Sequence, residues 1–299
     1  MRKIVLTLTA VTLAAAGLLS AAKKPAAEAK KPAATKPAAK PYWVEPMKKV
    51  HAKFKGDKAT FAHFGDSITV TMAFWSSLKY SHKNMDKDTQ RAFDLTKEYM
   101  QDKCWAGWKG GGFGNTGMMT IRWAHQNVDA WLKRMKPEVV LIMFGTNDLS
   151  ALALAEYRTK TAEVVQKCLD NGTIVILSTI PPRHGFDAKA KTFVEAVRKI
   201  AKEKKVPLCD FYKAIMARRP TDWDGALPKF KGTYEGGVYQ VPTLVAADGV
   251  HPSNPQKWVG DYSADGLKHN GFTLRNYVVL KSYYEVLAEV LEARVKASR

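Results

Sequence analysis

Four runs of apolar residues divide the chain from residue 59 onward. They cover residues 59–64, 138–144, 173–178 and 206–211. Segments with helical patterns follow or separate them, at about 70–79, 118–135, 152–170, 187–204 and 273–295. A strand made of consecutive apolar residues is buried on both faces, as in a parallel sheet covered by helices. The alternation therefore predicts an α/β protein, a three-layer α/β/α sandwich with a mostly parallel central sheet.

The first 22 residues have the pattern of a secretory signal peptide. Arg2 and Lys3 precede an apolar run over residues 4–19, and small residues follow up to Ala22. This run is shorter than the roughly 20 residues that a membrane-spanning helix needs. We therefore expect cleavage near Ala22 and a secreted or periplasmic protein.

Residues 23–41 form a low-complexity linker of lysine, proline and alanine. Six lysines and one glutamate lie in it, and it has almost nothing to bury in a core. We expect it to be disordered, either as a basic tether to anionic polymers of the cell envelope or as a solvated spacer. The folded catalytic domain is expected over residues 42–299.

The net charge of +19 is not confined to this linker. The first 41 residues contribute 7 of these charges, so residues 42–299 carry +12, which favours anionic partners. No zinc-finger, RNA-recognition or basic-zipper pattern is present, which argues against nucleic acid as the partner. The cysteines, Cys104, Cys168 and Cys209, are odd in number and lack a CxxC pair, so neither a disulfide framework nor a zinc site is indicated, although one bridge is compatible with the sequence.

Polar residues that suit acyl transfer follow the predicted strands. Ser67 follows the first strand, Asn147 follows the second, and Asp248 and His251 share one turn after a long loop. The carboxyl ends of parallel strands are where ligands bind in open α/β sheets. Ser67 would attack a carbonyl, His251 would take its proton, and Asp248 would hold the imidazole.

A glycine-rich segment, residues 107–117, precedes the second predicted strand. Gly112, Gly114 and Gly117 spell GxGxxG, but no hydrophobic strand precedes them, so a dinucleotide site is not indicated. The segment offers bare backbone N–H groups instead. An oxyanion hole would combine the N–H of Ser67, the N–H of Gly117 (or of Gly114) and the side-chain amide of Asn147.

Four sequence blocks together resemble the SGNH (GDSL) hydrolase superfamily. They are Phe-Gly-Asp-Ser-Ile-Thr at 64–69, the glycine segment, Gly-Thr-Asn-Asp at 145–148 and Asp-Gly-Val-His-Pro-Ser at 248–253. Thr-Ile-Pro-Pro at 179–182 is a further likeness. The resemblance covers about residues 59–290 and implies a flavodoxin-like sandwich and ester hydrolysis by Ser67, His251 and Asp248, without metal or cofactor.

Expected export, together with aromatic residues near the glycine segment and in the long loop that could stack on sugar rings, favours a carbohydrate O-acetylesterase. Its substrate would be an acylated small molecule or polysaccharide, including an anionic one. The expected substrate-binding residues are aromatic or cationic: Trp108, Arg218, Arg219, Trp223, Tyr234 and Tyr239. The alternatives are a lipid-directed esterase (a lysophospholipase or thioesterase), an O-acetyltransferase with the same triad, and a non-catalytic module that binds envelope polysaccharide. The acyl group, the alcohol, the oligomeric state and a lid role for residues 212–247 are left open.

Overall fold

The structure, a computed structural model, describes residues 40–106 and 117–293. The described residues belong to one compact unit that begins at Lys40. The predicted signal peptide and most of the linker lie outside the described residues. No helix within the described ranges is both long and apolar enough to cross a membrane.

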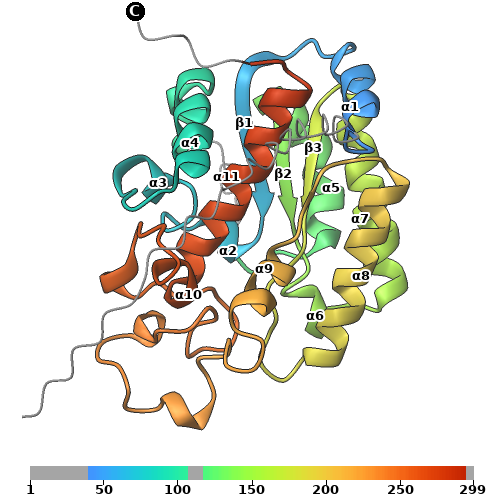
Figure 1. The fold of residues 1–299 in the computed structure, drawn as a ribbon. Helices are drawn as coiled ribbons and strands as arrows, with labels where there is room; N and C mark the ends of the chain where they lie inside the picture. The colour runs from blue at the N-terminus through green and yellow to red at the C-terminus, as the bar shows by residue number, and fades with distance from the viewer. Residues whose placement is uncertain (1–39, 107–116, 294–299) are drawn as a thin grey trace, which may run out of the picture. The chain divides into compact units, whose positions relative to one another are not determined.

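Four parallel strands form one sheet in the described part of the chain (Figure 1). They are β1 (Asp57–Gly65), β2 (Pro137–Met143), β3 (Ile174–Ser178) and β4 (Leu208–Cys209), in the spatial order β1-β2-β3-β4. β2 and β3 are buried along their whole length. Because sequential strands are neighbours, the carboxyl ends of β1 and β2, which carry the candidate residues, lie side by side.

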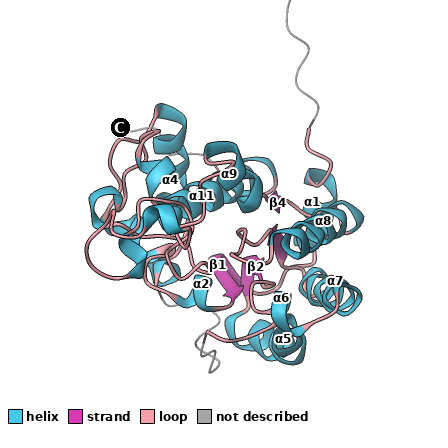
Figure 2. Ribbon diagram, turned by 90° about the horizontal axis from the view of Figure 1, so that it is seen from below, coloured by secondary structure: helices cyan, strands magenta, loops and turns pink. Residues whose placement is uncertain are grey.

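Helices cover both faces of the sheet (Figure 2). The crossover helices α5 (Ile121–Met135), α7 (Leu154–Asp170) and α8 (Asp187–Glu203) pack in sequence on one another. On the other face, α11 (Gly271–Glu289) packs against α4 (Lys87–Tyr99) and α9 (Phe211–Arg218). The remaining α-helices are α1 (Val44–His51), α2 (Ser67–Val70), α3 (Ser76–Tyr80), α6 (Asp148–Ala151) and α10 (Gly266–His269). The three-layer α/β/α prediction is confirmed.

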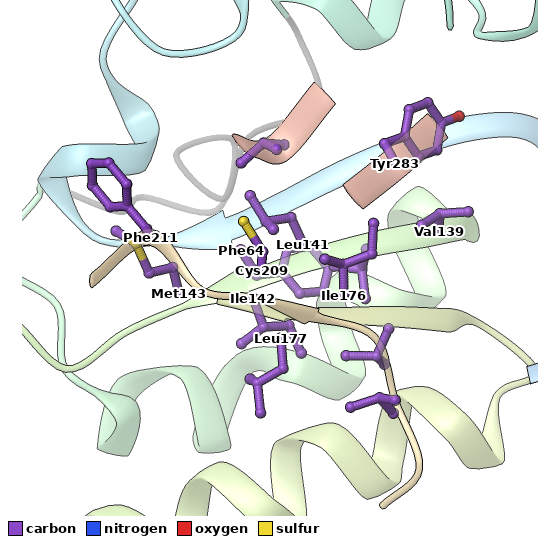
Figure 3. Packing of buried hydrophobic residues seen from close by; sticks show 14 of the residues in the cluster. Phe64, Val139, Leu141, Ile142, Met143, Ile176, Leu177, Cys209, Phe211 and Tyr283 are labelled. Carbon is purple, nitrogen blue, oxygen red and sulfur yellow. The ribbon is translucent and has the colours of Figure 1, made fainter. Parts of the chain in front are cut away.

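Buried side chains from β1 reach both helical layers. Phe61 stacks on Tyr283 of α11, and Phe64 lies against Trp131 of α5, each with ring centroids 4.1 Å apart. Figure 3 shows the same core around β2 and β3, with Leu141 and Ile176 among its apolar residues. This two-sided burial is why the strands have apolar residues at consecutive positions.

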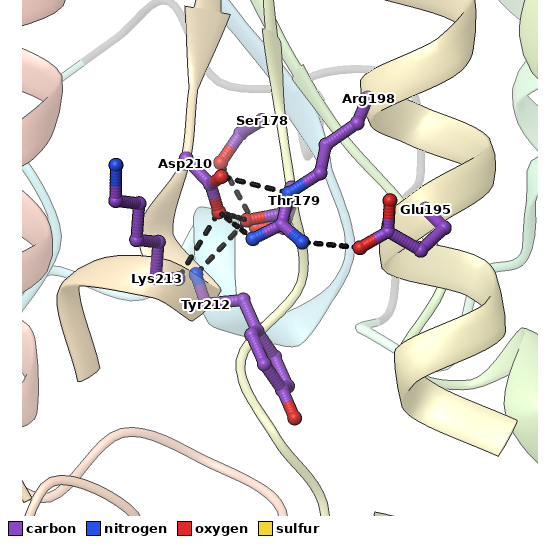
Figure 4. A network of polar contacts seen from close by, with 7 residues as sticks. All are labelled: Ser178, Thr179, Glu195, Arg198, Asp210, Tyr212 and Lys213. Carbon is purple, nitrogen blue, oxygen red and sulfur yellow. Dashed lines mark hydrogen bonds and ion pairs between the residues drawn. The ribbon is translucent and has the colours of Figure 1, made fainter. Parts of the chain in front are cut away.

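The edge strand β4 is shorter than the predicted strand at 206–211. Its next residue, Asp210, turns away and caps α9 by accepting a hydrogen bond from Lys213 N–H (3.0 Å). Arg198 of α8 holds the same carboxylate at 2.8 Å, as Figure 4 shows. The capping and the ion pair end the strand earlier than its apolar pattern suggests.

The predicted helix at 70–79 is interrupted. It forms the short helices α2 and α3, between which Trp75 has a left-handed φ of +61°. Asn276 of α11 accepts a hydrogen bond from Trp75 N–H at 2.8 Å and donates to Ala73 O at 3.2 Å. Asn276 lies 201 positions after Trp75 in the chain, so the local sequence could not reveal the break.

Candidate active site

Ser67 lies at the turn from β1 into α2. Asp66 caps α2 by accepting a hydrogen bond from Ile68 N–H at 3.1 Å. The fully buried Arg275 of α11 donates to Ile68 O and to Thr69 Oγ1, the latter at 2.9 Å. Both ends of the turn are therefore fixed by buried polar contacts that leave the Ser67 hydroxyl beside His251.

The three expected triad residues lie together. Ser67 Oγ is 2.9 Å from His251 Nε2, and His251 Nδ1 is 2.7 Å from Asp248 Oδ2. The second oxygen of Asp248 accepts hydrogen bonds from the N–H groups of Val250 (2.8 Å) and His251 (3.0 Å). Burial alone would raise the pKa of Asp248, but these bonds outweigh it and lower the pKa. Asp248 is therefore an anion at neutral pH, suited to stabilising an imidazolium.

Two of the three expected oxyanion donors, Ser67 N–H and the Asn147 side-chain amide, point at one atom, the carbonyl oxygen of Gly117. Ser67 N–H donates to it at 2.9 Å and Asn147 Nδ2 at 3.3 Å, while Asn147 Nδ2 also donates to Met119 O at 3.0 Å. Gly117 has a φ of +95°, and a Cβ there would lie 3.2 Å from Ser67 Cβ. Gly117 is thus the described glycine next to the candidate nucleophile, whereas Gly114 lies outside the described residues.

Asn147 is held in place by its neighbours. Asp148 Oδ1 accepts a hydrogen bond from Ile121 N–H at the start of α5 (2.9 Å), which ties this turn to the segment after Gly117. Gly145, at a φ of +135°, packs against Ile180 and Tyr157, and Tyr157 Oη donates to Phe144 O at 2.9 Å. Burial raises the pKa of Asp148 to about 6, although hydrogen bonds from backbone N–H groups offset part of the effect.

A pocket of about 480 Å³ opens beside these residues. Its lining includes Ser67, Asn147 and His251 together with Gly117, Met118 and Arg183. Among residues 40–106 and 117–293, no group of three or more His, Cys, Asp or Glu side chains is placed to hold a metal ion. All three cysteines are buried and free.

The structure changes the expected set of substrate-binding residues. Trp223 is buried in the core, so it offers no ring face to a sugar. Arg219 is also buried and bonds Asp222 (2.7 Å) and Pro242 O (2.5 Å), which makes it a structural residue. Arg218 lies over the Tyr277 ring and is not part of the pocket lining.

Of the expected aromatic residues, Tyr239 lies near the site. Its ring centroid is 5.9 Å from that of His251. Tyr234 is half-buried in the same long loop and does not line the pocket. Trp108 lies outside the described residues.

The sequence pattern did not single out Arg183 or the partner of His184. Arg183 follows Thr-Ile-Pro-Pro directly, and its position after β3 is the one signal in the sequence. His184 Nδ1 lies 2.6 Å from Asp224 Oδ2, and its N–H donates to Gly249 O at 2.8 Å. His184 therefore supports the turn that carries Asp248 and His251.

Comparison with known families agrees with this geometry. The model of the GDSL-like lipase/acylhydrolase family matches residues 63–255, which is more than half of the chain. The chain belongs to this family. As a GDSL-like hydrolase it acts on ester bonds, and the resemblance found in its sequence blocks is confirmed. No curated protein matches it.

Three solved structures similar to this GDSL-like hydrolase are those of TesA, Axe2 and EstA. TesA is 19% identical, with 77% of this chain and 99% of that chain covered and a TM-score of 0.47. A catalytic mutant of Axe2, an acetylxylan esterase from Geobacillus stearothermophilus, is 16% identical and has a TM-score of 0.48. The match covers 82% of this chain and 100% of the Axe2 chain. The psychrotrophic esterase EstA from Pseudoalteromonas sp. is 16% identical and has a TM-score of 0.46. The match covers 77% of this chain and 98% of the EstA chain.

Proposed function

We propose that this GDSL-like hydrolase is an exported serine esterase that removes acetyl groups from carbohydrate, with Ser67 as nucleophile. The observation that carries the proposal is the continuous series of contacts from Ser67 Oγ through both nitrogens of His251 to Asp248, at 2.9 Å and 2.7 Å. A nucleophile, a base and an orienting acid at hydrogen-bond distance are the parts that acyl transfer needs.

The proposed reaction has two halves. In the first, Ser67 Oγ attacks the acyl carbonyl while His251 Nε2 takes the hydroxyl proton. The imidazolium then gives this proton to the departing alcohol oxygen as the ester C–O bond breaks. In the second half, His251 removes a proton from water, the hydroxide attacks the acyl-Ser67 ester, and acetate leaves as Ser67 recovers its proton. Asp248 stabilises the imidazolium in both halves.

The substrate's carbonyl oxygen has to take the place of the Gly117 carbonyl. Ser67 N–H and Asn147 Nδ2 both donate to Gly117 O, so their donors already point at a common centre. We propose that substrate binding turns the Gly117 carbonyl away, and a glycine permits this change at low backbone cost. Asn147→Ala should then slow kcat by about 10²–10³-fold; an unchanged kcat would remove Asn147 from the oxyanion site.

The acetyl preference rests on two observations. Three of the ten lining residues, Met118, Ala151 and Val250, have apolar side chains and six have polar ones, so we expect a short acyl group to be preferred over a long acyl chain. The predicted signal peptide supports export, and an exported enzyme would meet extracellular or periplasmic polysaccharides. Export itself is tested by sequencing the N-terminus of the protein recovered outside the cytoplasm: cleavage near Ala22 supports it, and an intact N-terminus contradicts it.

The function is tested with p-nitrophenyl acetate, p-nitrophenyl octanoate and acetylated polysaccharides. We expect the wild type to prefer acetate over octanoate, to release acetate from the polysaccharides, and to lose both activities in Ser67→Ala. Thr192→Ala is the control, since it removes an exposed hydroxyl from α8. Octanoate preference would indicate a lipid-directed esterase, whereas transfer of acetyl to a sugar instead of water would indicate a transferase. No turnover by folded protein would leave polysaccharide binding as its role.

A further inference from the structure

Arg183 is the arginine that lines the pocket of the candidate nucleophile. It follows β3 and reaches the turn that carries Asn147, where its Nη1 donates to Thr146 O at 2.6 Å. Its guanidinium also stacks on the Phe186 ring, 4.6 Å from the ring centroid. Two contacts therefore fix the position of the guanidinium beside the pocket, which lowers the entropy lost when it binds a ligand.

The charge of Arg183 has no acidic partner in the part of the chain that the structure describes. Four other described arginines pair with carboxylates, among them Arg122 with Glu156 and Arg198 with Asp210. Arg183 instead contacts a backbone carbonyl and an aromatic ring. A guanidinium has five N–H donors, so one bond to Thr146 O leaves most of them available.

The rest of the pocket favours an anion as well. No aspartate or glutamate is among its described lining residues, and the other ionisable side chain there is His251. Partial burial lowers the pKa of Arg183, but a guanidinium stays charged at neutral pH. An anion entering this pocket therefore meets a fixed positive charge without a competing carboxylate.

We propose that Arg183 recognises a carboxylate on the alcohol portion of the substrate, so that the preferred esters are O-acetylated sugars that carry a carboxyl group. This inference rests on the proposed function, because an acetyl group has no second ionisable group and the charge must lie on the alcohol. A planar carboxylate matches the two parallel N–H donors of a guanidinium. Arg183 thus takes the role that the sequence suggested for Arg218 and Arg219.

The test compares one substrate in two charge states. The probe is an O-acetylated oligogalacturonide, and its partner is the same oligomer with the carboxyl groups methyl-esterified. For the wild type we expect kcat/KM to favour the charged form by about 10- to 100-fold, the range for a hydrogen bond to a charged group. The preference should lie mainly in KM and shrink with added salt, since a partly exposed ion pair is screened.

Two substitutions of Arg183 separate recognition from positioning. Arg183→Gln removes the charge and should abolish most of the preference, while Arg183→Lys should retain part of it. Arg91→Gln is the control, because it removes an equal charge from an exposed position on α4 and should leave the preference unchanged. If Arg183→Gln lowers kcat/KM for both forms equally, Arg183 only positions the Asn147 turn and the proposal is wrong.

Binding distinguishes failure of this inference from failure of the proposed function. If the wild type releases no acetate from either form, calorimetry with the charged oligomer on Ser67→Ala and on Ser67→Ala/Arg183→Gln still reports recognition. Binding that is at least 10-fold weaker in the double variant supports the inference without the esterase activity. Equal binding by the two variants overturns it.

Discussion

Gly145→Ala tests whether the turn before Asn147 is as tightly packed as the structure indicates. A Cβ at Gly145 would lie 2.8 Å from Ile180 Cγ2 and 2.9 Å from Tyr157 Oη, and the φ of +135° is one that alanine rarely adopts. The backbone strain costs about 1–3 kcal/mol. Crowding in a packed interior costs about 1–3 kcal/mol more. We therefore expect a loss of about 2–6 kcal/mol in unfolding free energy, which for a domain of this size lowers Tm by about 5–20 °C.

Gly232→Ala is the matched control. Gly232 has a φ of +78° and is exposed, and no atom lies within 4 Å of the position that a Cβ would take there, so it isolates the backbone cost. Its substitution should lower Tm by only a few degrees, about 2–4 °C per kcal/mol. Thermal unfolding followed by circular dichroism measures both variants, and kcat on p-nitrophenyl acetate should fall in Gly145→Ala because Asn147 moves. An equal Tm shift in the two variants would refute the packing argument.

Three further predictions concern buried groups. Arg275→Met removes the buried donor to Ile68 O and Thr69 Oγ1, and leaving these two oxygens without it should cost about 2–6 kcal/mol in urea unfolding. Arg91→Met, at an exposed position, should cost under about 0.5 kcal/mol. Equal losses would contradict the role of Arg275. Burial raises the pKa of Asp148 to about 6 from 3.8, so the native state keeps a proton that the unfolded chain has lost. Unfolding free energy should therefore fall as pH rises from about 4 to 6, and Asp148→Asn should remove part of this slope; an identical pH profile in the variant would show that Asp148 does not contribute. Burial raises the pKa of Cys104 and Cys209 to about 11 and that of Cys168 further. The native protein should therefore not react with Ellman's reagent until it unfolds. Rapid labelling of the native protein would show that a thiol is accessible.

The strands were predictable because their burial leaves a direct record in the sequence. β2 and β3 are covered on both faces, so nearly every position is apolar and the run itself marks the strand. β4 lacks this clarity because Asp210 begins the cap of α9 within the apolar run. The break at Trp75 depends on Asn276, and no local pattern records a contact across 201 positions.

In the candidate site too, some residues could be predicted from the sequence and others could not. Ser67, Asn147 and His251 could be found from sequence because each follows a strand or lies in a short block whose spacing has chemical meaning. The substrate-binding residues could not be predicted in this way, because the presence of arginine and tryptophan in a loop does not show which of their side chains are buried. Trp223 and Arg219 proved to be structural, whereas Arg183 lines the pocket.

The most direct test of the central claim is to locate the nucleophile by covalent trapping. Diethyl p-nitrophenyl phosphate phosphorylates an activated serine hydroxyl and releases p-nitrophenol, which reports the stoichiometry. Peptide mass spectrometry then identifies the labelled residue. We predict one diethylphosphoryl group per chain, on Ser67, and none in Ser67→Ala or in His251→Ala, which lacks the base 2.9 Å from the hydroxyl. A label on another residue, or full labelling of Ser67→Ala, would contradict the assignment of Ser67 as the nucleophile.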